Sequence, residues 1–243
     1  MTNLYETVEL TKKYIEQLRR DGITEVIVSE KSKSKIKKSV ENKNSIATEL
    51  LKLAQQVSVC RECPLYKTRK NAVFGEGNPH AKLMFVGEGP GFDEDRLGRP
   101  FVGRAGELLD KIITEPRALA LKREDVYIAN IVKCHPMIDP SQPDKRGNDR
   151  KPQPDEINAC LPYLKKQIEL IKPKIICALG SVSATTLTGT EAPLGRLRGR
   201  FYDYQGCAAD IKVIATYHPA ALLRNPHWKK DTWEDIKEIK KEL

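Results

Sequence analysis

Residues 81–91 read AKLMFVGEGPG, an apolar stretch that runs directly into a loop of glycine, glutamate and proline. A short apolar run that ends in glycine is typical of a buried β-strand. Three later segments have the same character and are expected to be strands too: DVYIANIV (125–132), PKIICALG (173–180) and IKVIATYH (211–218). Helical patterns alternate with these runs, which predicts a three-layer α/β/α fold around a central, mainly parallel four-stranded sheet.

Each predicted strand ends in chemically distinctive residues. The first leads into the glycine loop, the second carries Asn130, the third meets Gly180 and Ser181, and the fourth delivers His218 before Pro219. Ligands bind at the carboxyl ends of the strands in open α/β sheets. We therefore expect these four strand ends to form one cleft.

The glycine loop is not expected to bind a polyphosphate. Its spacing is G-x-G-x-G, which matches neither the dinucleotide fingerprint nor the P-loop. The loop also carries four carboxylates that would repel phosphate groups: Glu88, Asp93, Glu94 and Asp95. Its occupant has to be identified from the rest of the chain.

The overall charge favours a polyanionic partner. The chain has 243 residues and a formal net charge of +9, and basic groups bind nucleic acid by neutralising phosphates and releasing counterions. Charge alone is equally compatible with a basic protein that binds no nucleic acid. The sequence has no apolar run of transmembrane length, and its opening, MTNLYETVEL, lacks the layout of a signal peptide. A cytoplasmic protein without membrane contact is expected.

Two segments precede the predicted α/β domain. Residues 3–20 place apolar side chains on one helical face, and 31–43 (KSKSKIKKSVENK) is a run typical of a flexible basic linker. A second helix is expected to follow, with an apolar stripe that ends just before Cys60. The sequence thus predicts an N-terminal helical extension with a linker over 1–43 and a main domain over 44–243.

The six cysteines favour metal ligation or core thiols over disulfides, because the cytosol keeps thiols reduced. Zinc, an iron–sulfur cluster and unliganded thiols are all open, but ligands so dispersed along the chain favour a 4Fe-4S cluster over a zinc ribbon. Cys177 and Cys207 are interpreted as a core thiol and a surface thiol. The four candidate ligands are Cys60 and Cys63 in a C-x-x-C pair, Cys134 after the second strand, and Cys160.

Four segments carry a family pattern: GEGPG (87–91), GRPFVGRAG (98–106), VYIANIVKC (126–134) and HPAALLRNP (218–226). With the four cysteines, they resemble the family 4 uracil-DNA glycosylases, the iron–sulfur members of the uracil-DNA glycosylase superfamily. The resemblance covers about residues 50–243. It implies a monofunctional DNA-repair enzyme that flips deoxyuridine out of DNA, hydrolyses its N-glycosidic bond and leaves an abasic site. It also implies a 4Fe-4S cluster on Cys60, Cys63, Cys134 and Cys160.

The resemblance assigns roles to three side chains. Phe101 is expected to stack on the flipped uracil, Asn130 to hydrogen-bond the edge of the base, and His218 to donate to uracil O2 as charge builds on the leaving group. The structural alternatives are a core phenylalanine, an asparagine paired within the protein and a structural histidine.

The glycine loop receives a role as well. Gly87, Gly89 and Gly91 are expected to let the backbone approach the flipped nucleotide closely. Glu88 or Glu94 is expected to position a water molecule or to stabilise positive charge on the sugar.

Two segments near the C-terminal part of the chain are expected to contact DNA, one through leucine and arginine and the other through arginines. In AALLRN (220–225), Leu222 or Leu223 would wedge into the gap left by the base, and Arg224 would contact the backbone or fill space. The structural alternative is a short helix that buries both leucines. Phosphate contacts are also expected from the three arginines of LGRLRGR (194–200): Arg196, Arg198 and Arg200.

The chain departs from the family pattern in one loop and lacks the insertion of another branch. The segment 135–159 is longer than in family members, so a rearranged loop under the cluster is expected. The histidine-containing basic insertion of a DNA cross-linking branch is absent after GRPF, so turnover is expected, and no lysine is placed as a Schiff-base nucleophile.

Two alternative functions are a non-catalytic iron–sulfur module for nucleic-acid binding or electron transfer, and a zinc-stabilised nucleoside hydrolase. The expected partner is uracil-containing DNA, single- or double-stranded, and the expected state is a monomer.

Overall fold

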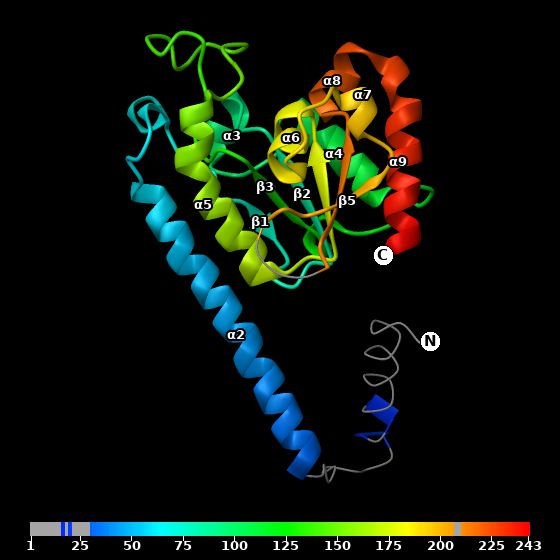
Figure 1. Cartoon of the computed structure of the whole chain (residues 1–243). Coiled ribbons are helices and arrows are strands. Elements are labelled where there is room, and N and C mark those ends of the chain that lie inside the picture. The colour runs from blue at the N-terminus through cyan, green and yellow to red at the C-terminus, as the bar shows by residue number, and fades with distance from the viewer. Residues whose placement is uncertain (1–15, 18, 21–29, 207–209) are drawn as a thin grey trace. The chain divides into compact units, whose positions relative to one another are not determined.

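The computed structural model describes residues 16–17, 19–20, 30–206 and 210–243 (Figure 1). Most of the helix predicted over 3–20 lies outside the described residues, as does Cys207. The chain divides into two compact units, Met1–Asn42 and Lys43–Leu243. None of the helices in the described ranges is long and apolar enough to cross a membrane.

A sheet of six strands forms the centre of the larger unit, in the order β1-β3-β2-β4-β6-β5. The four central strands are parallel and coincide with the four predicted ones, which confirms the fold class. β1 and β5 are antiparallel edge strands that the sequence analysis did not find, because strands of two and three residues show no periodicity. The bounds are β1 Glu76–Gly77, β2 Leu83–Gly87, β3 Tyr127–Asn130, β4 Ile175–Leu179, β5 Phe201–Asp203 and β6 Lys212–Thr216.

Alternate residues of the strands build an apolar core on each face of the sheet. Met84 and Val86 of β2 belong to one core, to which α2, α5, α6 and α7 contribute, whereas Leu83 and Phe85 belong to the other, with α4 and α9. The sheet therefore lies between two helical layers (Figure 1). The bounds of these helices are α2 Glu30–Val59, α4 Arg104–Thr114, α5 Pro154–Ile171, α6 Ser181–Thr188, α7 Leu194–Leu197 and α9 Lys229–Glu242. The shorter helices are α3 Phe92–Leu97, α8 Pro219–Arg224, η1 Pro64–Lys67, η2 Arg123–Asp125 and η3 Pro226–Trp228.

Helix α2 runs through the segment that the sequence predicted as a linker. Residues 31–43 are helical in the structure, not a flexible connection. The run contains no glycine or proline, and lysine and glutamate are good helix formers, so its polarity does not prevent a helix. The next part agrees with the prediction, since Leu50, Leu53 and Val57 are buried in the larger unit.

The parallel strands bring the distinctive residues together at the carboxyl ends of the strands. β3 lies on one side of β2, and β4 and β6 lie on the other, so the chain reverses its direction of winding at β2. The carboxyl end of β2 is therefore a topological switch point. Gly87 at the end of β2 pairs in register with Asn130 at the end of β3. β4 ends just before Gly180, and β6 ends just before Tyr217 and His218.

Candidate active site

A cleft of about 640 Å³ opens at the carboxyl ends of the parallel strands. Its walls come from the loop after β2, the loop 98–103 between α3 and α4, the end of β3, the start of α6 and the segment after β6. We call 98–103 the Phe101 loop. The strand ends therefore converge on one cleft, as expected. Of the residues singled out in the sequence, those that line it are Glu88, Gly89, Gly91, Asp93, Glu94, Phe101, Asn130, Gly180, Ser181, His218 and Arg224.

Asn130 is buried beside the cleft, with 1% of its surface exposed. Its Oδ1 atom has no hydrogen-bond partner among the described residues. A buried acceptor without a partner costs about 1–3 kcal/mol, so this atom indicates a ligand that supplies the missing donor. Gly87 lies directly beside it: a Cβ atom at Gly87 would be 2.3 Å from Asn130 Oδ1 and 2.6 Å from Phe101 Cζ. Glycine is required here for the two side chains to come this close.

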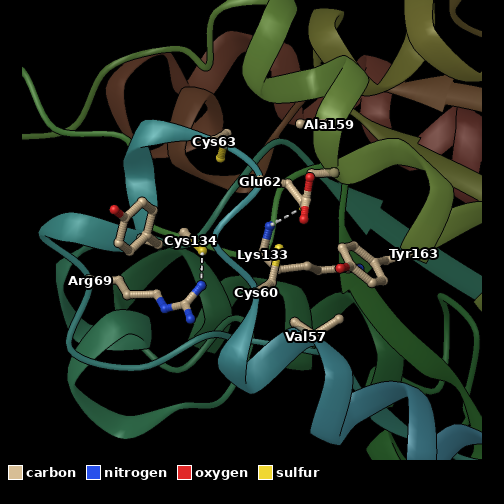
Figure 2. A pocket seen from close by; sticks show the side chains of 11 residues that line it. Val57, Cys60, Glu62, Cys63, Arg69, Lys133, Cys134, Ala159 and Tyr163 are labelled. Atoms are coloured by element: carbon tan, nitrogen blue, oxygen red, sulfur yellow. Dashed lines mark hydrogen bonds between the residues drawn. The ribbon is translucent and has the colours of Figure 1, made fainter.

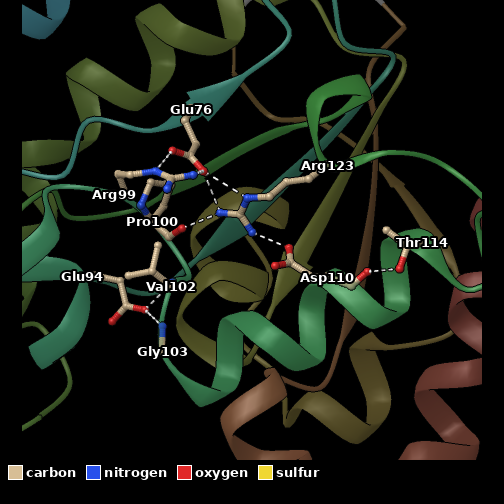
Figure 3. Close-up of polar contacts among 9 residues, drawn as sticks. All are labelled: Glu76, Glu94, Arg99, Pro100, Val102, Gly103, Asp110, Thr114 and Arg123. Carbon is tan, nitrogen blue, oxygen red and sulfur yellow. Dashed lines mark hydrogen bonds and ion pairs between the residues drawn. The ribbon is translucent and has the colours of Figure 1, made fainter.

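Phe101 adopts a left-handed backbone conformation with φ of 50°. A non-glycine residue in this region costs about 1–3 kcal/mol and persists only where its surroundings impose it. Glu94 supplies one restraint, because its Oε1 accepts hydrogen bonds from the amides of Val102 (2.8 Å) and Gly103 (3.0 Å) (Figure 3). Its Oε2 accepts from the Gly91 amide (3.2 Å). Glu94 thus ties the glycine loop to the Phe101 loop.

A second restraint holds the same loop at Pro100. Arg123 donates hydrogen bonds to the carbonyl oxygen of Pro100 (2.6 Å), to Glu76 Oε1 (2.8 Å) and to Asp110 Oδ1 (2.5 Å) (Figure 3). Arg99 donates to both oxygens of Glu76, at 2.8 and 3.1 Å. This network, which we call the Arg123 hub, joins β1, α4 and the Phe101 loop.

His218 is the N-cap of α8, and the helix it begins orients its imidazole. The amide of Ala220 donates to His218 Nδ1 (3.1 Å), so the neutral ring carries its proton on Nε2. Burial lowers the pKa of His218 to about 4, with a further contribution from Arg224. The ring is therefore neutral near pH 7 and has one N–H to donate. Its centroid lies 5.4 Å from that of the Phe101 ring, so the imidazole and the phenyl ring are neighbours in the cleft.

The two candidate carboxylates have different environments. Burial raises the pKa of Glu88, partly offset by the nearby charge of Lys151, and both side chains line the cleft. Both oxygens of Glu94, in contrast, accept hydrogen bonds from backbone amides. Asp95 is buried and accepts from the amides of residues 70 and 71. Glu88 is therefore the carboxylate of this loop with the environment of a reactive group.

Helix α8 separates the two leucines that were expected to compete as wedges. Leu222 is 1% exposed, whereas Leu223 is 38% exposed. Arg224 is exposed and lines the cleft. Because a short helix turns one side to the core, Leu222 is a core residue, and the expectation that it could enter DNA is not supported.

Two of the arginines expected at phosphates also differ. Arg196 is exposed on α7. Arg198 instead donates to both oxygens of Asp235 in α9, at 3.0 and 2.8 Å, and Asp235 is fully buried. Thr216 donates to the same carboxylate (2.6 Å). Arg198 is therefore needed to neutralise a buried charge and holds α9 against β6, so the expected phosphate contact is wrong for this residue.

Four thiols line a second cavity (Figure 2), which shares no lining residue with the cleft. They come from the segment after α2, from the segment after β3 and from α5. Arg69 Nη1 donates to Cys134 Sγ (3.0 Å), and the Lys133 amide donates to Cys160 Sγ (3.2 Å). Cys177 is fully buried in β4, as expected of a core thiol. The four cavity thiols are Cys60, Cys63, Cys134 and Cys160.

Four thiols around one cavity are a donor set that could hold an iron–sulfur cluster or a zinc ion. Zinc requires four ligand atoms around one point, with sulfur about 2.3 Å from the metal. Within the described residues, no three His, Cys, Asp or Glu side chains are placed to hold one metal ion. In a 4Fe-4S cluster each thiolate binds a different iron, so the ligands surround a cavity instead of a point. Arg69 and Lys133 beside the thiols would offset the negative charge of such a group.

The long segment between Cys134 and Cys160 leaves this cavity intact, because α5 carries Cys160 into it. The segment lies instead against α3. Arg146 pairs with Asp93 (2.8 Å) and lies over the Phe92 ring at 4.7 Å. Part of the segment, including Pro136 and Lys151, also forms a wall of the cleft.

Several lining residues were missed in the sequence, among them Lys151, Tyr217 and Trp228. Lys151 is one of several basic residues in the long segment, and Trp228 lies outside every motif, so neither had a distinguishing pattern. For Tyr217, its position directly before His218 was the available signal.

Comparisons with known proteins identify the family of the chain. The family model described as the uracil DNA glycosylase superfamily matches residues 74–237. A type-4 uracil-DNA glycosylase of Saccharolobus solfataricus is 46% identical over 195 residues, which cover 79% of this chain and 85% of the relative. One of Sulfurisphaera tokodaii is 44% identical, with coverage of 79% and 83%. One of Thermotoga maritima is 42% identical over 191 residues, with coverage of 77% and 91%.

Proposed function

Because the chain belongs to the uracil-DNA glycosylase superfamily, we propose that it removes uracil from DNA by hydrolysing the N-glycosidic bond of deoxyuridine. The products are free uracil and an abasic site. The observation that carries the proposal is the buried, unpaired Oδ1 of Asn130 in a cleft shared with Phe101 and His218. The substrate is a flipped nucleotide, since the base has to leave the stack to enter such a cleft.

Asn130 selects the base. Uracil presents an N3–H donor beside its O4 acceptor, which matches the Oδ1 acceptor and the amide donor of one asparagine. Cytosine presents the opposite pattern and would leave Oδ1 unpaired. Phe101 stacks on the pyrimidine ring, and the close approach allowed by Gly87 keeps the base from shifting along the cleft.

His218 stabilises the leaving group. When the bond between C1′ and N1 breaks, its electron pair goes to the uracil ring and is shared with O2. The Nε2–H of the neutral His218 donates to O2 as this charge develops. A donor of this kind accelerates a reaction by about 10²–10³-fold.

Glu88 acts on the sugar side. A water molecule adds to C1′ and passes its proton to the Glu88 carboxylate, whose negative charge also stabilises the cationic sugar. Its raised pKa suits a general base. Glu94 is a positioning residue that fixes the Phe101 loop.

The DNA lies across α8. Leu223 fills the space that the flipped nucleotide vacates, and Arg224 contacts the backbone beside the cleft. Arg196, exposed on α7, contacts a phosphate farther along the strand.

The four cavity thiols would hold a 4Fe-4S cluster. When bound, the cluster supplies a covalent crosslink between segments far apart in the sequence. Lys133 supports a structural role for the cluster, because it connects the thiol cavity to the cleft. Its amide donates to Cys160 Sγ, and its Nζ donates to the carbonyl oxygen of Asn130 (2.9 Å). We further propose that residues 44–243 form the glycosylase domain and that 1–43 lie outside it.

The test is a uracil-release assay on an oligonucleotide that contains one uracil. Asn130→Asp and His218→Ala are expected to lower the release rate by about 10²-fold or more, with thermal unfolding midpoints close to that of the unchanged protein. Rates equal to the parent in both variants would contradict the assignment of the site.

A further inference from the structure

Two aromatic side chains stack on each other next to His218. The rings of Tyr217 and Trp228 have centroids 4.5 Å apart and planes 6° apart. Both line the cleft, and Trp228 is 36% exposed. Uracil recognition and bond cleavage, as described above, use neither residue. An exposed indole in a cleft wall therefore needs another explanation.

The stack has firm support. Tyr217 directly follows β6, and Trp228 ends η3 just before α9 begins. The guanidinium of Arg198 lies over the Tyr217 ring at 5.8 Å and is itself fixed by the buried Asp235. The indole is thus held in a fixed plane before any ligand arrives, which reduces the entropy that binding costs.

The surroundings of the stack are basic. Arg224 lines the same cleft, and Lys229 and Lys230 directly follow Trp228 and are exposed. The short helix η3, which carries Trp228, packs against both α8 and α9, and both helices reach the same end of the domain (Figure 1). An aromatic ring among cationic side chains is the combination that binds single-stranded nucleic acid, because the ring stacks on a base and the cations contact its phosphates.

The cleft has room for a second base. Its volume of about 640 Å³ lies within the range of about 300–1,000 Å³ that holds drug-sized ligands. A single pyrimidine is smaller than such a ligand, so a uracil on Phe101 leaves part of the cleft free. A strand whose uracil enters at Phe101 and His218 carries its neighbouring nucleotides past the cleft rim.

We propose that Trp228, backed by Tyr217, is a stacking platform for the unpaired base next to the flipped uracil on the same strand, with Lys229 and Arg224 at the phosphates. The identity of the strand rests on the proposed function, but the platform itself binds uracil-free DNA. Since the neighbouring base is already stacked and paired in a duplex, the platform favours single-stranded substrate.

The first test uses fluorescence, because the chain has two tryptophans, Trp228 and Trp233. A Trp233→Phe variant reports on Trp228 alone. Titration with a single-stranded thymine oligonucleotide is expected to quench its emission saturably, whereas the matched Trp228→Phe variant, which keeps Trp233, shows little change. Binding detected by the anisotropy of a labelled oligonucleotide without quenching in Trp233→Phe would overturn the proposal.

The second test measures affinity for the same oligonucleotide. Trp228→Ala is expected to weaken binding by about 5- to 100-fold, the range for one base–aromatic stack, and Trp228→Phe to restore most of it. The salt dependence stays the same in Trp228→Ala, because no phosphate contact is lost, whereas Lys229→Ala lowers its slope by about one. Affinity of Trp228→Ala within twofold of the parent, or an equal loss on duplex DNA, would contradict the platform.

These readouts are independent of catalysis. If the protein releases no uracil but Trp228 is quenched by thymine DNA, the proposed function fails and the platform stands. If uracil is released and Trp228 does not respond, the platform fails alone.

Discussion

At the scale of single residues, the glycine loop and the helix α3 that follows it place two carboxylates six positions apart in opposite environments. Glu88 has a raised pKa and lines the cleft, whereas both oxygens of Glu94 accept hydrogen bonds from backbone amides. Sequence motifs could identify both as candidates but could not separate them, because the difference lies in what folds around each carboxylate. The same limit applies to Leu222 and Leu223, and to Arg198, whose partner Asp235 is far along the chain.

The two carboxylates should therefore respond differently to the same substitution. Glu88→Gln removes the general base and is expected to lower kcat by about 10²-fold or more, with an unchanged thermal midpoint. Glu94→Gln removes the charge that binds three amides and is expected to lower the thermal midpoint together with activity. Equal losses of stability in the two variants, measured by thermal unfolding, would contradict this division.

The pH dependence of activity should follow Glu88. The Glu88 carboxylate has to be ionised to act as a base. Because its pKa is raised, kcat/KM is expected to fall, as the pH is lowered, at a pH above the range in which carboxyl groups usually titrate. His218, with a pKa of about 4, stays neutral through most of that fall and does not set it. In Glu88→Gln the residual rate is expected to be nearly independent of pH in this range. A residual rate that keeps the parent's acidic limb would assign the limb to another group.

At the scale of elements, short connections position the site. The four parallel strands could be predicted from their apolar runs, and the cleft from the residues that end them. The edge strands and the Arg123 hub could not, since β1 has two residues and Glu76, Asp110 and Arg123 come together only in the fold. The hub holds Pro100 and thereby the strained Phe101.

Removing the hub should loosen the stacking face. Arg123→Met deletes hydrogen bonds to two carboxylates and to the Pro100 carbonyl, and bonds to charged groups contribute about 1.5–3 kcal/mol each. We expect a lower thermal midpoint and a kcat/KM for uracil release reduced by about tenfold or more. The matched control is Lys122→Met, which loses only an exposed pair with Glu124 worth about 0–1 kcal/mol. Equal kcat/KM in the two variants would show that the hub does not position Phe101.

At the scale of the whole molecule, the chain divides between Asn42 and Lys43. The helical propensity of lysine and glutamate outweighed the polarity that had suggested a linker over 31–43. The cleft and the thiol cavity both belong to the unit that begins at Lys43. Four thiols in one cavity could be anticipated from the cysteine pattern, whereas the route of the segment 135–159 could not.

A shortened protein of residues 43–243 should therefore fold and release uracil. Its kcat on a uracil oligonucleotide is expected to stay within about twofold of the full chain, and its affinity for DNA to be lower at low salt, because basic residues have been removed. A folded fragment with little activity would place part of the site in residues 1–42.

The most direct test of the proposed function combines two measurements on one anaerobically purified sample. Uracil release and abasic product are measured on a single-uracil oligonucleotide, and iron and zinc are determined in the same protein. We expect free uracil together with about four irons per chain and little zinc. Folded, iron-loaded protein that binds the oligonucleotide without releasing uracil would contradict the account and favour a non-catalytic nucleic-acid-binding module.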